Sequence, residues 1–166
     1  MLFNCGKCKV MDIGYSNSQS DYSLLGNEIE SVDQEEDLGI IISMDLTFIK
    51  QRIKAEKKAQ KLIGHTKRQY KYRNKDTVLQ LYTSLVRPHL EYGAQFLAPS
   101  IQRDIDRLEE VQGRATKLVP TLRQFGYRQR MERLNLLDLQ TRRLRGPVIE
   151  AFNILEGITN IDYKSL

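Results

Sequence analysis

A long run of basic side chains is the feature of this sequence with the clearest chemical use. Between Ile49 and Lys75, eleven Lys and Arg residues stand against one acid, Glu56. Such a one-signed surface repels itself in water, and a phosphate backbone relieves the repulsion and releases counterions. We therefore expect this run to bind nucleic acid, through Lys50, Lys54, Lys57, Lys58, Lys61, Lys67, Arg68, Lys71 and Arg73.

Two aromatic residues, Tyr70 and Tyr72, lie inside the basic run. Aromatic rings beside cations can stack on bases, and stacking tolerates any base sequence. The alternative is a solvated helix face with tyrosines in the core. Because the charge is almost entirely positive over so many helical turns, nucleic-acid contact is favoured over the solvated face.

The Cys5-Gly6-Lys7-Cys8 motif has the spacing of half a metal site. A zinc site needs two more ligands at suitable spacing, and the two histidines, His65 and His89, are far away in the sequence. A redox pair would be followed by a helix, whereas here a strand-like run follows. We predict two small, half-buried cysteines at a turn and no metal site.

Carboxylates and histidines give no catalytic constellation. Glu109 and Glu110 are adjacent on an expected helix and point to different sides, and residues 35–37 fall in an expected loop. They are interpreted as solvated charges, caps and ion-pair partners. His65 and His89 are interpreted as structural or solvated, with no nucleophile nearby. We predict no catalytic residue and no cofactor in this chain.

Charge divides the chain into two regions. Residues 1–48 hold 2 basic and 9 acidic residues, a net −7, and residues 49–166 hold 24 basic and 12 acidic ones, a net +12, which together give the +5 of the whole chain. The composition, 40% hydrophobic and 28% charged, is that of a globular protein. The sequence lacks a membrane-length apolar run and a signal peptide. We expect an intracellular protein, nuclear or cytoplasmic and not secreted.

Short β elements are expected in the first region. Residues 9–15 alternate loosely and end near Gly14, and residues 38–42 are rich in β-branched side chains. Residues 22–25 and 28–32 flank Gly26-Asn27, which predicts a hairpin.

Helices follow from about Asp45, where Asp45 or Thr47 can act as a cap. The first has Ile49, Ile53, Ala59, Ile63 and Thr66 near one stripe. The second helix is expected to begin near Asp76 and to end before Pro88, and the third to begin at Ser100 and to end at Pro120. Two more span residues 128–134 and 137–155, with a kink or break at Gly146-Pro147. Their apolar positions are Val78, Leu79, Tyr82, Leu85, Val86, Ile101, Ile105, Leu108, Val111, Ala115 and Leu118.

The expected fold class is α+β, mostly α. A small antiparallel β piece covers residues 1–46, and a bundle of four or five helices covers residues 47–166.

Three stretches resemble the thumb of reverse transcriptases from LINE-type, jockey-like non-LTR retrotransposons. They are DTVLQLYTSLVRPHLEYG at 76–93, LEEVQGRATKL at 108–118 and LNLLDL with RRLRG at 134–146. The amino-terminal FNCGKCKVM at 3–11 is similar to the end of that family's palm. The resemblance covers nearly the whole chain.

The resemblance implies particular roles for three residues. Lys7 matches a lysine near the incoming nucleotide, while Leu38 and Gly39 in DLGI match the primer grip, a turn that approaches the 3′ end of the primer. The family's Phe/Tyr-x-Asp-Asp motif is missing, because no Asp-Asp pair occurs in this sequence. The parent polymerase would use Mg²⁺, and this chain holds no carboxylate for it.

These observations predict a truncated reverse-transcriptase fragment. It would bind RNA–DNA or DNA–RNA template–primer duplexes without regard to sequence and without polymerase activity of its own. One alternative is a helical protein-interaction module, and another is a retrotransposon relic without function. No membrane partner is expected, and an exposed sheet edge could associate with another chain.

Overall fold

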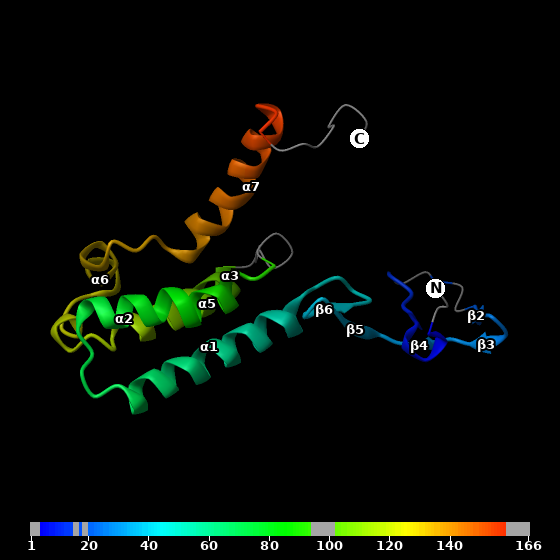
Figure 1. Ribbon diagram of the computed structural model, residues 1–166, viewed down its shortest axis with the longest axis horizontal. Coiled ribbons are helices and arrows are strands. Elements are labelled where there is room, and N and C mark those ends of the chain that lie inside the picture. Colours follow the sequence, from blue (N-terminus) through cyan, green and yellow to red (C-terminus); the bar gives the residue numbers. More distant parts are fainter. Residues whose placement is uncertain (1–3, 15–16, 18–19, 94–101, 159–166) are drawn as a thin grey trace. The chain divides into compact units, whose positions relative to one another are not determined.

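A computed structural model describes residues 4–14, 17, 20–93 and 102–158. It divides into two compact units, residues 1–53 and residues 54–166. In the first unit strands predominate, and in the second helices predominate, so the chain is α+β and mostly α, as predicted (Figure 1). In the described part of the chain, none of the helices combines the length and apolarity needed to cross a membrane.

The first unit contains three pairs of short strands. A 3₁₀ turn, Cys5–Lys7, precedes β1 (Lys9–Val10), which pairs in parallel with β4 (Glu30–Ser31). β2 (Ser23–Leu24) and β3 (Asn27–Glu28) form the predicted hairpin, but its turn is Leu25-Gly26, one residue earlier than the predicted Gly26-Asn27. Hairpin β5 (Gln34–Asp37) and β6 (Ile40–Ser43) turns at Leu38-Gly39. The parallel pair departs from the expected antiparallel piece.

Strand β5 corrects the prediction that residues 35–37 lie in a loop. Its acidic side chains favour a loop by composition, but the two-residue turn places Glu35 opposite Ile42 and Glu36 opposite Ile41. The Lys9 ammonium also lies 2.9 Å from a Glu35 carboxylate oxygen. Cross-strand pairing therefore overrides the low β-propensity of these acids.

Helix α1 (Ile49–Gln69) confirms the predicted first helix, with one correction to its apolar stripe. Ala59, Ile63 and Thr66 are buried as expected and Ile53 is half-buried, whereas Ile49 is 43% exposed in the first turn. Asp45 does not cap the helix: its carboxylate accepts hydrogen bonds from the backbone N–H and hydroxyl of Thr47, ahead of the helix. The Ser43 hydroxyl also donates to this carboxylate, at 2.6 Å, and the hydrogen bonds from Ser43 and Thr47 lower the pKa of Asp45.

The division between the two units falls within α1, later than the predicted boundary at residue 46. The reason lies in the first turns of the helix. The Gln51 side chain is buried, donates to the Gly39 carbonyl at 3.2 Å and accepts from the Ile41 N–H at 3.1 Å. Gln51 thereby ties the start of α1 to the β5–β6 hairpin.

The second unit contains α2 (Lys75–Leu81), a π-helical turn (Tyr82–Val86), α3 (Arg87–Glu91), α5 (Gln102–Thr116), a 3₁₀ turn (Pro120–Leu122), α6 (Tyr127–Leu134) and α7 (Leu139–Leu155). Its core confirms most predicted apolar positions. The buried members are Ala59, Ile63, Val78, Tyr82, Val86, Leu90, Leu108, Val111, Ala115, Leu118, Val119, Leu122, Leu134 and Leu139. Ile105 is buried too, and Leu79 is half-buried. Leu85 is 46% exposed, contrary to prediction, and Ile101 and Ser100 lie outside the described residues.

The helical segment does not stop before Pro88, which corrects the prediction made from that proline. The Arg87 N–H bonds to the Tyr82 carbonyl, five residues back, so the backbone widens by one residue at this point. Pro88 then occupies the first turn of α3, where its missing N–H costs little.

Pro147 does not break the last helix either. Helix α7 continues from Leu139 to Leu155 with Pro147 inside it. Its amino end is strongly held: the Asp138 side chain accepts from the Thr141 N–H at 2.6 Å. The structure therefore excludes the predicted break at Pro147, and the alternative of a kink stays a prediction.

Candidate nucleic-acid interface

The basic residues of α1 form one stripe along the helix. With 3.6 residues per turn, the spacings of four, three, four and seven place Lys50, Lys54, Lys57, Lys61 and Arg68 along one side; we call this set the basic stripe. All five side chains are exposed. From Lys54 to Arg68 the stripe extends about 21 Å at 1.5 Å per residue.

The opposite side of α1 is the buried one. Gln51, Ala55, Ala59, Ile63 and Thr66 are each at most 9% exposed. Because burial fixes the rotation of the helix, the basic stripe is directed away from the core.

The lysines in the middle of α1 have no acidic partner in the described part of the chain. Glu56 lies nearer the buried side, where its carboxylate accepts from the Gln60 amide at 2.7 Å. In the described ranges, no carboxylate is within ion-pair distance of Lys57, Lys58 or Lys61. Lys50 bonds to the Gln34 side-chain oxygen, a neutral partner. Lys57, Lys58 and Lys61 therefore keep a concentrated positive charge on α1.

The carboxyl end of α1 carries more exposed cations and both tyrosines. Lys67, Arg68 and Lys71 are exposed, and Lys67 and Arg68 lie in the last helical turn, where cations also interact favourably with the helix dipole. Tyr70 is 44% exposed and Tyr72 is 84% exposed. Tyr72 is thus available to a ligand and is not the core residue of the alternative interpretation.

Arg73 has a structural role that the sequence did not reveal. Its Nη1 donates to the Lys67 carbonyl at 2.8 Å and to the Tyr70 carbonyl at 3.2 Å. It therefore satisfies carbonyls at the end of α1 and is half-buried. Of the nine predicted contact residues, Arg73 is the one whose charge is directed into the protein.

The turn at Leu38 and Gly39 has the backbone of a tight hairpin. Their φ angles are 48° and 79°, as a two-residue turn with both residues in the left-handed region requires. Leu38 is 82% exposed at the tip. Leu25 and Gly26, at φ 53° and 78°, show the same pattern, so the geometry is common to both hairpins.

Lys7 is exposed and is the last residue of the 3₁₀ turn Cys5–Lys7, between the two cysteines of the motif. The cysteines are free and half-buried, as predicted. The Cys5 thiol lies 3.6 Å from the Leu24 carbonyl, and the Cys8 thiol lies 3.4 Å from the Asn4 carbonyl. Each thiol thus contacts its own backbone acceptor.

The paired acids on α5 have the structural roles expected of them. One Glu109 oxygen accepts the N–H groups of Leu139 at 2.6 Å and Gln140 at 3.1 Å, which are unsatisfied donors at the start of α7. Glu110 forms an ion pair with Arg114 at 2.7 Å. The two carboxylates therefore do not converge on a common site.

The residue that sequence reasoning missed is Gln112, which is fully buried. Its side-chain nitrogen donates to the Tyr127 hydroxyl at 3.0 Å and to the Leu137 carbonyl at 3.2 Å. Its oxygen accepts from the Tyr82 hydroxyl. One amide thus joins the π-helical turn, α5, α6 and the segment before α7. A polar residue among apolar positions gives no signal of this kind in a single sequence.

Burial raises the pKa of both tyrosine hydroxyls of this network above the ordinary value. Tyr127 also donates to Glu109 at 2.5 Å, which raises its pKa further. Both hydroxyls therefore remain protonated at neutral pH and act as donors. The network stabilises the helix assembly, and no proton is poised to be lost.

A second set of polar contacts joins α3 to α7. The Arg142 guanidinium pairs with the Glu91 carboxylate, with one Nη2–Oε2 distance of 3.3 Å. The buried Arg143 donates to the Leu90 carbonyl at 2.7 Å. The stretches 76–93, 108–118 and 134–146 are therefore in direct contact with one another.

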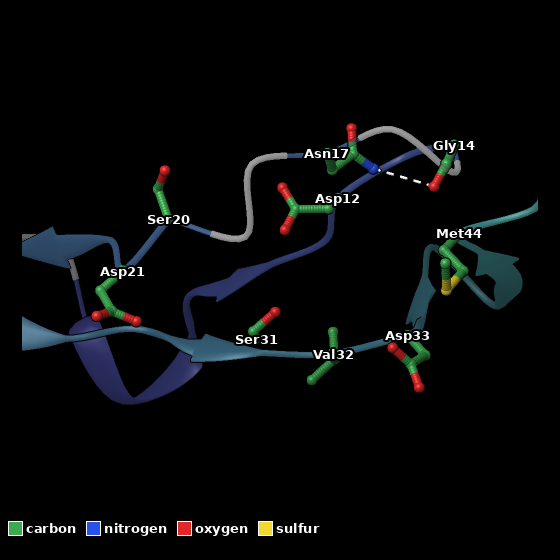
Figure 2. Close-up of a pocket in the computed structure, with 9 residues that line it drawn as sticks. All are labelled: Asp12, Gly14, Asn17, Ser20, Asp21, Ser31, Val32, Asp33 and Met44. Atoms are coloured by element: carbon green, nitrogen blue, oxygen red, sulfur yellow. Dashed lines mark hydrogen bonds between the residues drawn. The ribbon is translucent and has the colours of Figure 1, made fainter.

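A hollow in the first unit has a different chemical character. It measures about 360 Å³ and is lined by Asp12, Gly14, Asn17, Ser20, Asp21, Ser31, Val32, Asp33 and Met44. Figure 2 shows the three aspartates at separate places along the lining. Such a lining does not favour a phosphate. Over the residues with described positions, no three His, Cys, Asp or Glu side chains are grouped to hold a metal ion.

Neither histidine belongs to a group of metal-ligating side chains in the described residues. His65 is exposed on α1, and His89 is half-buried on α3. Both positions agree with the solvated or structural roles predicted for them.

Comparisons with known proteins add no assignment. No family model, curated protein or solved structure gives a significant match to the chain. The candidate site therefore rests on the geometry and charge of α1.

Proposed function

We propose that this chain binds duplex nucleic acid, without regard to sequence, through the basic stripe of α1 and the cations at the end of that helix. The observation that carries the proposal is the orientation of the stripe: its side chains are exposed on the side of α1 opposite the buried Ala55, Ala59 and Ile63. Binding of phosphates would neutralise a repulsion that the protein itself leaves in place.

The length of the stripe suits a duplex backbone. Phosphates follow one another at roughly 3.4 Å of axial rise along one strand, so a stripe of about 21 Å faces roughly six of them. Lysines on a helix contact phosphates as point charges and do not read base edges. The expected binding is therefore weak in sequence preference and strong in salt dependence.

The ancestry we propose is the palm end and thumb of a LINE-type reverse transcriptase. Support comes from the contacts among the three thumb-like stretches: their distinctive residues Glu91, Glu109 and Gln112 form the polar contacts that join them. In this proposal the partner is an RNA–DNA template–primer duplex. The chain has no polymerase activity of its own, since the sequence has no Asp-Asp pair.

Under the same proposal, Leu38 and Gly39 form a primer-grip-like turn and Lys7 lies near a nucleotide. The tight turn and the 82% exposure of Leu38 support contact with a primer end, because the tip is accessible.

Binding to an RNA–DNA hybrid at about 50 and about 200 mM salt tests the proposal. The affinity of the natural chain should fall by roughly a hundredfold or more over that range, if four or more phosphates are contacted. Replacement of four lysines by glutamine should weaken low-salt binding and flatten the salt dependence. The substitutions are Lys54→Gln, Lys57→Gln, Lys58→Gln and Lys61→Gln.

A matched control removes the same number of charges from other exposed sites of the second unit. The substitutions are Arg103→Gln, Arg107→Gln, Lys117→Gln and Arg128→Gln. This variant should lose much less affinity than the α1 variant. Equal losses would show that only net charge matters, and no binding at about 50 mM salt would reject the proposed function.

A further inference from the structure

The second half of α7 has an exposed apolar stripe that nothing in the described structure covers. Leu144 is 63% exposed, Val148 68%, Phe152 57% and Leu155 68%. Their spacings of four, four and three place them on one side of the helix, together with Ala151. We call these residues the α7 apolar stripe. Monomeric proteins rarely expose a continuous apolar patch of more than a few hundred Å² without a function for it.

The helix that carries this stripe is satisfied at both ends. Asp138 and Glu109 accept the first N–H groups. At the other end, Gly157 has a φ of 67° and donates to the Ile154 carbonyl at 3.1 Å, while Ile158 donates to the Asn153 carbonyl at 2.8 Å. This pair of bonds is a Schellman motif, a stable helix stop.

The first half of α7 anchors the helix within the second unit. Leu139 is fully buried and Arg143 is 7% exposed. Five residues after Arg143, at Val148, the side chain is 68% exposed. The stripe therefore starts next to the buried, anchoring part of α7.

The charges beside the stripe indicate what covers it. Arg145 and Glu156 flank the stripe on the same side, one near each end of the exposed half. In an antiparallel pair of identical helices centred between residues 150 and 151, each Arg145 faces Glu156 of the other copy. In a parallel two-fold pair, this side of one helix would face the other side of its partner, so Arg145 and Glu156 would not meet each other.

We propose that a second copy of this chain covers the α7 apolar stripe in an antiparallel, two-fold symmetric helix pair. The same symmetry stacks Ile149, which is 45% exposed, near Phe152 of the other copy. A C₂ interface repeats every contact, so each opposite-charge pair occurs twice.

The charge content of this segment argues against a lipid surface as the occupant. Residues 144–158 contain one cation, Arg145, and two acids, Glu150 and Glu156. Helices that lie on membranes are rich in Lys and Arg on their polar face. A nucleic acid has no apolar surface that would cover Leu144, Val148 and Leu155.

Sedimentation velocity over a concentration series tests the proposal, with charge reversal at the two flanking residues. The natural chain should show a monomer–dimer equilibrium. Arg145→Glu and Glu156→Arg should each weaken dimerisation by about tenfold or more, because a two-fold interface converts two attractions into two repulsions. The double variant Arg145→Glu/Glu156→Arg should restore the dimer.

Two further variants make the result specific to the stripe. Glu150→Arg, on another side of α7, should leave dimerisation unchanged, whereas Val148→Asp/Leu155→Asp should abolish it. Circular dichroism checks that each variant keeps its helix content. A natural chain that stays monomeric at high concentration would overturn the proposal. So would a double charge variant as weak as the singles, or a dimer that survives Val148→Asp/Leu155→Asp, which would point to the open strand edges instead.

Discussion

At the scale of single residues, the structure shows that the most informative side chain is a buried glutamine. Gln112 is fully buried and bonds to Tyr82, Tyr127 and Leu137, so one amide satisfies three partners from different segments. A buried polar network of this kind specifies a unique arrangement only when every member is satisfied. Without this amide, the Leu137 carbonyl and the hydroxyls of Tyr82 and Tyr127 would each lose a hydrogen-bond partner.

Replacement Gln112→Leu should therefore lower the free energy of unfolding by about 2–3 kcal/mol, since buried groups lose hydrogen bonds without access to water. Urea denaturation at neutral pH measures the change. Gln140→Leu is the matched control, because the Gln140 side chain is exposed, and it should change stability by less than about 0.5 kcal/mol. A Gln112→Leu protein as stable as the natural chain would show that the network contributes no net stability.

At the scale of elements, α1 combines a buried side that stabilises it with a basic stripe that destabilises it. Lys57 and Lys61 are four residues apart on that stripe, and like charges at this spacing repel each other. The packing of Ala59 and Ile63 outweighs this cost, so the helix forms in the absence of a polyanion. Under the proposed function, a bound phosphate backbone would relieve the same repulsion.

The double variant Lys57→Gln/Lys61→Gln should be at least as stable as the natural chain, with a gain of about 0.5 kcal/mol at low salt. Thermal unfolding at about 10 mM and about 1 M salt measures it, and screening should remove the gain at high salt. Arg114→Gln, which breaks the pair with Glu110, should instead cause a small loss. A clear loss of stability in the lysine variant would mean that these lysines have stabilising partners.

At the scale of the whole molecule, opposite charge is concentrated in the two units. Residues 1–53 hold 4 basic and 9 acidic residues, a net −5, and residues 54–166 hold 22 and 12, a net +10. Attraction of a polyanion is therefore expected from the second unit. Attraction of a polyanion is distinct from polymerase activity, because two-metal phosphoryl transfer requires carboxylates that converge on two ions about 4 Å apart.

Primer extension on a homopolymer template with Mg²⁺ should give no product above background with this chain. A complete reverse transcriptase on the same duplex is the positive control, and added chain should slow it at low salt by competition for the duplex. Synthesis by the chain alone would contradict the proposed absence of polymerase activity.

The sequence by itself determined the class of fold and the approximate position of most elements. Apolar spacing predicted residues 128–134 as a helix, and α6 spans Tyr127–Leu134. Gly26 marked the first hairpin, since glycine readily adopts the positive φ of 78° that the turn requires. These features are local, because periodicity and turn chemistry depend on neighbouring residues alone.

Tertiary structure alone decided where the helices continue and what the polar residues do. Pro88 predicted a helix stop, yet a π-helical turn at Tyr82–Val86 carries the helical segment past it. Of the kink or break predicted at Pro147, the continuous α7 excludes the break. The role of Arg73, at the end of α1, depends on the path of the chain after that helix. The role of Gln112, in the core, depends on residues far from it in the sequence. The physical reason is the same in each case: a hydrogen bond or a buried contact requires a partner, and folding determines which partner is within reach.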